Sequence, residues 1–176
     1  MIAQHHERLN GTGLPLGLQE DEISLLSQIV MVVDEYDDLC NLSENRHHVT
    51  PHEILSQMYR DVTINKTHAF NGEILVTLIQ LLGVYPPGTL VELNDGKMGV
   101  AVNINAINRS KPQVLLYTPH GGRKEAVVVD LGENDDLHIT RSLPPATVSS
   151  NIRQYLSPHR MTAYFPKTSD IPTFSG

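Results

Sequence analysis

The sequence predicts an α+β fold, with a helical part at residues 1–85 and a small antiparallel β module with a C-terminal tail at 86–176. Three observations lead to this division. Apolar residues recur at helical spacing in several segments before residue 83, Pro86-Pro87 then interrupts the pattern, and short runs of strand-forming residues separated by turn residues follow. Of the 176 residues, 40% are hydrophobic, which is enough for a packed core.

The helical part is predicted to contain three main helices. The first covers 21–39, where apolar residues fall at positions 23, 26, 29, 30 and 33. The second begins at the capping box formed by Thr50 and Glu53 and ends near residue 60. The third covers 73–82 and stops at a glycine. Before them, the glycine-rich stretch 1–17 is expected to be a short helix end that runs into a loop.

The β module is predicted from short runs of residues that favour strands. The first two strands, 89–93 and 98–104, flank an Asp-Gly hairpin turn. Further strands are expected at 114–117, 126–131 and 138–140, followed by a short helix near 148–155. A glycine before the first strand and the hairpin resemble the opening of SH3-like small barrels. The module is either a structural lid packed on the helices or a surface for partners.

Composition narrows the function classes. Thirteen Lys and Arg against 20 Asp and Glu give a formal charge of −7, which disfavours binding to long nucleic acids. The single cysteine, Cys40, excludes an intrachain disulfide and fits a reducing compartment. No signal peptide and no apolar run long enough to span a bilayer is visible. A cytoplasmic location is therefore expected.

Histidines and acidic residues in the helical part suggest a metal site. His5 and His6 are adjacent, and Asp34 and Asp37 form an acidic pair at the end of an otherwise apolar helix. Imidazole and carboxylate groups are common ligands of Mn, Fe and Zn. Because neighbouring side chains on a helix diverge by about 100°, adjacent histidines there suit two ions better than one. By itself the His-His pair is weak evidence for a metal site, because two solvated histidines are the commoner case.

Two sequence blocks resemble the HD-GYP family of metal-dependent phosphohydrolases. The run His-His-Glu-Arg-Leu-Asn-Gly-Thr-Gly-Leu-Pro at 5–15 is similar to the family signature, and 33–39 resembles the helix that carries its ligand aspartate. The resemblance implies that the helical part is the C-terminal half of an HD-type all-α domain, from a class of bacterial signalling enzymes that hydrolyse cyclic di-GMP. It implies His5, His6 and Asp34 as metal ligands, with Mn or Fe as the ion at full, partial or no occupancy.

The resemblance extends to other positions, at which this sequence differs in part from the family motifs. The loop Gly11, Gly13, Leu14 and Pro15 corresponds to the GYP motif, but leucine replaces the tyrosine, and Asn10 stands where the family has aspartate. These changes place the contacts of that loop in doubt. Arg46 falls near the family's Arg-Pro-Tyr motif and is either a phosphate contact or a solvated loop residue. Asp37 is either a hydrogen-bond partner of a metal-bound histidine or a helix-end residue.

The family's His-Asp dyad lies upstream of the His-His-Glu block, and no histidine in this sequence is followed directly by aspartate. The leading hypothesis is therefore a phosphodiesterase fragment that is catalytically incomplete as this chain. A non-enzymatic signalling or interaction module on the same scaffold is the second hypothesis, and an unrelated metal-binding regulator the third. Expected partners are a cyclic dinucleotide, an upstream HD half or another signalling protein, and a second copy of the chain.

Overall fold

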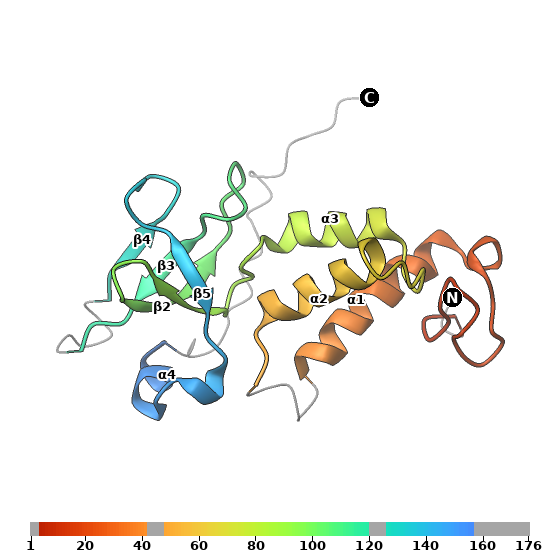
Figure 1. Cartoon of the computed structure of the whole chain (residues 1–176), viewed down its shortest axis with the longest axis horizontal. Coiled ribbons are helices and arrows are strands. Elements are labelled where there is room, and N and C mark those ends of the chain that lie inside the picture. Colours follow the sequence, from red (N-terminus) through yellow and green to blue (C-terminus); the bar gives the residue numbers. More distant parts are fainter. Residues whose placement is uncertain (1–3, 42–47, 120–125, 157–176) are drawn as a thin grey trace, which may run out of the picture.

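The computed structural model describes residues 4–41, 48–119 and 126–156. The helical part contains the 3-10 helix η1 (Glu20–Glu22) and the helices α1 (Leu25–Asn41), α2 (Pro51–Thr63) and α3 (Gly72–Leu82). Figure 1 shows these helices at one end of the molecule and the sheet at the other. The predicted α+β class is confirmed. The short helix end expected before the glycine-rich loop is not found within residues 4–17, which form turns and irregular structure.

Local capping chemistry sets the ends of α2 and α3. Thr50 and Glu53 form the expected capping box, with the Thr50 Oγ1 accepting from the Glu53 amide and the Glu53 carboxylate accepting from the Thr50 amide. Asn71 caps α3, and Gly83 ends it at φ 77°, a left-handed conformation that glycine adopts at little cost. The three helices share a core of buried apolar side chains: Val32, Ile54, Met58 and Leu75.

The β module is a five-stranded antiparallel sheet with the order β4-β3-β2-β1-β5. Its strands are β1 (Leu90–Leu93), β2 (Met98–Asn103), β3 (Gln113–Leu116), β4 (Val128–Asp130) and β5 (Ile139–Ser142). The last strand returns to pair with β1, and the 3-10 helix η3 (Pro145–Thr147) and α4 (Ser150–Leu156) come after it. Among the described residues no β4–β5 pairing closes the sheet, so the SH3-like barrel stays an interpretation.

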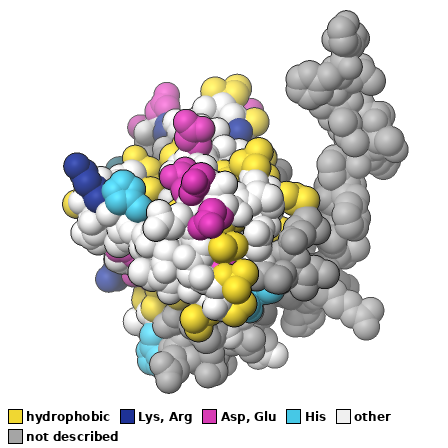
Figure 2. Space-filling model, turned by 90° about the vertical axis from the view of Figure 1, so that its right-hand side faces the viewer, with side chains coloured by type: hydrophobic (Ala, Val, Ile, Leu, Met, Phe, Trp, Pro, Cys, Tyr) yellow, Lys and Arg dark blue, Asp and Glu magenta, His cyan; other side chains and the backbone are white. Residues whose placement is uncertain are grey.

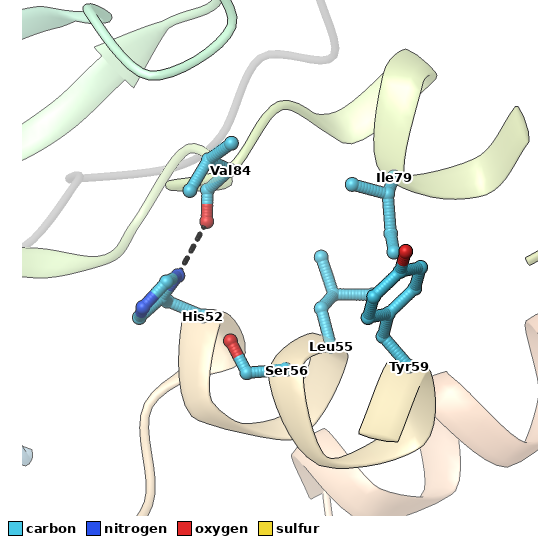
Figure 3. A pocket seen from close by; sticks show the side chains of 6 residues that line it. All are labelled: His52, Leu55, Ser56, Tyr59, Ile79 and Val84. Carbon is cyan, nitrogen blue, oxygen red and sulfur yellow. Dashed lines mark hydrogen bonds between the residues drawn. The ribbon is translucent and has the colours of Figure 1, made fainter. Parts of the chain in front are cut away.

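Direct contacts join the helices to the β module. The Thr50 Oγ1 donates to the Ser142 Oγ at 3.0 Å, which places the start of α2 against the end of β5. Close by in α2, the His52 Nδ1 lies 2.7 Å from the Val84 carbonyl oxygen, so Nδ1 carries the proton and donates (Figure 3). The His52 ring also stacks on Tyr85, with 4.6 Å between ring centroids. These contacts favour a β module that is packed on the helices, while the boundary near residue 85 stays a prediction.

No helix in the described part of the chain combines the length and the apolar character that a membrane crossing requires.

Candidate metal centre

Two segments far apart in the sequence bring together three side chains of the types that bind metal ions. His5 and His6 lie in the N-terminal turn, Asp34 lies on α1, and one ligand atom from each falls within 4.8 Å of the others. Ligands about 2.1 Å from a shared ion are at most about 4.2 Å apart, so small side-chain adjustments would suffice for a common ion. The predicted convergence of the three side chains is observed.

The adjacent histidines reach one point because they are not on a helix. Their ring centroids are 3.9 Å apart with an interplanar angle of 43°, in a turn rather than the helical geometry considered from the sequence. The argument that adjacent histidines suit two ions therefore does not apply here. His5 and Asp34 are partly buried, whereas His6 is exposed, so solvent reaches the group from the side of His6.

Glu7 holds the glycine-rich loop against the histidines. Its side chain is completely buried, and its two carboxylate oxygens accept hydrogen bonds from the backbone amides of Leu16 at 2.8 Å and Leu18 at 3.0 Å. Gly13 packs so closely that a Cβ there would lie 2.2 Å from the Glu7 backbone. The Leu14 amide also donates to the His6 carbonyl oxygen at 3.1 Å. The sequence prediction did not identify Glu7, although its position in the His-His-Glu signature pointed to it.

The structure shows the surroundings of the two residues that differ from the family signature, Asn10 and Leu14. Asn10 uses both ends of its amide: Oδ1 accepts from the Thr12 amide and hydroxyl, and Nδ2 donates to the Thr67 carbonyl oxygen at 2.8 Å. An ionised aspartate could not make that donation, because a carboxylate only accepts. Leu14, at the position of the signature tyrosine, is 71% exposed. This loop therefore presents an apolar side chain to solvent at the position of the signature tyrosine.

The remaining candidates lie outside this group of three. The Asp37 carboxylate accepts from the Asn41 amide group at 3.0 Å, and its carbonyl oxygen accepts from the same group. This contact favours the helix-end role of Asp37. Arg46 lies outside the described residues. Burial raises the pKa of the Cys40 thiol and that of the neighbouring Tyr36 phenol, which keeps both groups protonated and makes Cys40 a poor nucleophile at neutral pH.

Acidic residues stand near the site. Glu20, Asp21 and Glu22 form η1 and are all exposed, and the Gln4 amide group donates to the Glu22 carbonyl oxygen at 3.4 Å. Figure 2, which views the molecule from the right-hand end of Figure 1, shows acidic side chains gathered near the middle of this face with hydrophobic ones beside them. Negative charge in this region favours the approach of a cation over that of a free phosphate.

Comparison with known proteins agrees with this geometry. Residues 1–63 match the family model of the HD domain. This segment is therefore similar to an HD domain. Among curated proteins, the cyclic di-GMP phosphodiesterase PA4108 of Pseudomonas aeruginosa is 29% identical to this chain over 113 residues, a match that covers 64% of this chain and 26% of the relative. The resemblance to the HD-GYP family, made from the signature blocks, is confirmed.

Two further relatives extend the comparison. The cyclic di-GMP phosphodiesterase PdeB of Borreliella burgdorferi is 26% identical over 120 residues, 68% of this chain and 31% of that protein. The 3'3'-cGAMP-specific phosphodiesterase 3 of Vibrio cholerae is 49% identical over 39 residues, 22% of this chain and 8% of that protein. The matches thus span less than a third of each of these relatives. No solved structure matches the chain significantly.

The residues present fit a divalent ion. Two imidazoles and one carboxylate are a donor set suited to Mn, Fe or Zn, and HD domains are metal-dependent. Three protein ligands leave coordination positions for water or a phosphate oxygen. Within the described residues this is the one such group of three His, Cys, Asp or Glu side chains.

Proposed function

We propose that this chain is the C-terminal part of a metal-dependent cyclic dinucleotide phosphodiesterase, in which His5, His6 and Asp34 bind one Mn or Fe ion. The observation that carries the proposal is the convergence of three ligand atoms from two segments within 4.8 Å. The relatives support the substrate class, since they are named as cyclic di-GMP and 3'3'-cGAMP phosphodiesterases.

A bound divalent ion would lower the pKa of a coordinated water and neutralise charge on a phosphodiester. In this chain the two imidazoles would supply neutral nitrogen ligands, and Asp34 would supply one negative charge from a partly buried position on α1. Three ligands hold one ion, whereas a bridged pair of ions needs more. Loss of a single electrostatic contact in a transition state already costs on the order of 100-fold in rate. The chain alone is therefore expected to be inactive or nearly so.

An exposed apolar surface beside Asp34 supports the proposal that another protein segment packs against this part of α1. We name the side chains of Leu26, Val30 and Val33 the α1 stripe; they are 52%, 39% and 45% exposed. The stripe continues into a groove between α1 and α3 lined by Ile29, Val33, Ile74, Leu78 and Leu81, among others. Scattered apolar side chains are normal on surfaces, whereas large contiguous apolar patches mark interaction sites.

The position of the α1 stripe indicates what covers it. Val30 precedes Asp34 by four residues, so both lie on one side of α1 and the stripe leads directly to the ligand group. We propose that the other half of an HD domain, which carries the His-Asp dyad, packs on the stripe and supplies the missing ligands. The alternative occupant is a second copy of this chain, which would show as a dimer that a Val33→Lys substitution dissociates.

The test begins with metal binding by the 176-residue chain. Mn²⁺, Fe²⁺ and Mg²⁺ are titrated in turn into the wild type, His5→Ala and, as a control, His138→Ala, whose side chain is exposed in the β module. We expect binding of one Mn²⁺ or Fe²⁺ in the wild type and the control, and none in His5→Ala. A folded wild-type chain that binds neither ion would contradict the proposal and favour the non-enzymatic interaction module.

Hydrolysis of cyclic di-GMP and of 3'3'-cGAMP is measured in the presence of each of the same metal ions in turn. We expect no turnover above background by the chain alone, and metal-dependent turnover when an HD half with the dyad is present. Turnover by the chain alone that disappears in His5→Ala would refute the incomplete centre. It would mean that another residue, from this chain or from a second copy, replaces the dyad.

A further inference from the structure

We infer that Arg8 and Glu35 are a positioning pair, which holds the His5-His6 segment and Asp34 at metal-binding distance before the ion arrives. The inference rests on the proposed metal role of the three ligands. Arg8 lies two residues after His6, and Glu35 comes directly after Asp34 on α1. The ion pair between the Arg8 Nη2 and the Glu35 Oε2 therefore joins the two segments that supply the ligands.

Arg8 is held in place by further contacts besides this ion pair. Its Nη1 donates to the Glu7 carbonyl oxygen at 3.0 Å, and its guanidinium carbon lies 4.9 Å from the centroid of the Phe70 ring. The Arg8 and Glu35 side chains are 25% and 28% exposed, so water screens the pair only in part. A guanidinium fixed in this way loses less conformational freedom in binding Glu35 than a free surface side chain would.

A second contact between the two segments lies on the N-terminal side of the histidines. The buried Ser27 hydroxyl donates to the Gln4 Oε1 at 3.0 Å. Ser27 precedes Asp34 by seven residues, about two turns, and so lies on nearly the same side of α1. The histidine pair is thus attached to α1 both before and after, by contacts that need no metal ion. Arg8–Glu35 is the charged one of the two, and it adjoins the ligand aspartate.

This arrangement predicts a specific effect on metal affinity. If the pair is lost, the two segments sample separated positions, and the apparent dissociation constant for the ion rises in inverse proportion to the fraction that remains assembled. We expect roughly a threefold to tenfold rise, in keeping with a partly exposed ion pair.

The sign of the effect separates positioning from simple electrostatics. Removing the negative charge of Glu35 beside a cation weakens binding under either mechanism. Removing the positive charge of Arg8, however, would strengthen cation binding by electrostatics alone. Positioning predicts the opposite, namely that Arg8→Gln weakens Mn²⁺ binding as Glu35→Gln does. A merely structural salt bridge would lower thermal stability and leave the affinity of the folded chain unchanged.

The experiment measures the Mn²⁺ dissociation constant by electron paramagnetic resonance, and metal-free thermal unfolding in parallel. The variants are Arg8→Gln, Glu35→Gln and the charge exchange Arg8→Glu with Glu35→Arg. The matched control is Glu92→Gln, which breaks an ion pair with Arg141 in the β module. We expect weaker binding in both single variants, recovery in the exchange to within about twofold of the wild type, and no change in the control.

Equal or tighter Mn²⁺ binding by folded Arg8→Gln, with a normal wild-type affinity, overturns the positioning role and leaves the metal site standing. A folded wild type that binds no Mn²⁺ overturns both proposals. If Arg8→Gln does not fold, Arg8→Lys replaces it, because lysine keeps the charge but lacks the planar guanidinium. Lysine should then give an affinity between those of the wild type and Glu35→Gln, and a wild-type affinity would count against the inference.

Discussion

Replacement of Glu7 offers a quantitative check on how the site is built. Glu7 is fully buried and accepts backbone hydrogen bonds from Leu16 and Leu18, which lie nine and eleven residues further along the chain. In Glu7→Ala both backbone amides lose their acceptor. The loop that packs over the histidines should therefore detach from them.

The size of the effect can be worked out from the two bonds. A hydrogen bond to a charged group contributes about 1.5–3 kcal/mol, and each of these two is partly exposed, so the lower end of that range applies. Their combined loss is expected to lower the free energy of unfolding by about 3 kcal/mol. Glu7→Gln should cost about half as much, because the amide oxygen still accepts one bond while its NH₂ group faces the second donor.

Urea unfolding at pH 7, monitored by circular dichroism, measures the free energy, and amide hydrogen exchange reports the protection of Leu16 and Leu18. The matched control is Glu133→Gln, which changes the net charge equally at an exposed position. We expect faster exchange at both amides in Glu7→Ala and wild-type exchange in the control. Unfolding within about 0.5 kcal/mol of the wild type, with both amides still protected, would refute the role given to Glu7.

Other perturbations test other parts of the structure. Gly13→Ala should abolish Mn²⁺ binding measured by calorimetry, because its Cβ would lie 2.2 Å from backbone atoms of Glu7; unchanged affinity would contradict this packing. Thr50→Ala should lower stability to urea by about 1 kcal/mol through loss of the helix cap, and Thr50→Ser should restore most of it. Burial raises the pKa of the Tyr36 phenol, so above about pH 10 only the unfolded chain ionises this group. The free energy of unfolding should therefore fall as the pH rises above about 10, and Tyr36→Phe should reduce that fall. Limited proteolysis should spare residues 85–89, where the Thr89 side chain is buried and donates to a backbone carbonyl oxygen; rapid cleavage there into two folded pieces would show independent domains.

Features that depend on neighbouring residues were predictable from the sequence. The capping box at Thr50, the stop at Gly83 and the hairpin before β2 each require contacts within a few residues, and each occurs where expected. The convergence of His5 and Asp34 was predictable for another reason: the signature blocks carry spacing information from a known family. Periodicity alone could not have paired two segments separated by nearly thirty residues.

Features set by long-range packing were not predictable. The helical spacing of Ile23 predicts a first helix from residue 21, yet α1 begins at Leu25. Ile23 is buried from a loop position, against Leu9 and Met31, and a single apolar residue fits either arrangement. A strand is expected at 126–131, but β4 contains only Val128–Asp130. The β-branched residues of this segment favour a strand locally, yet only the three residues of β4 find pairing partners on β3.

Under the proposed function, the α1 stripe and the group of His5, His6 and Asp34 belong to one interface. Asp34 lies at the border between the buried side of α1, marked by Ser27 and Met31, and the exposed stripe that contains Val30. A partner that covers the stripe would thus lie beside the open coordination positions. If this partner supplies ligands, the factor by which it raises the affinity of the chain for the ion must equal the factor by which the ion raises the affinity of the chain for the partner. Arg8–Glu35 can align only the three proposed ligands of this chain, so under the proposed function we expect the isolated chain to bind metal more weakly than the assembled domain does.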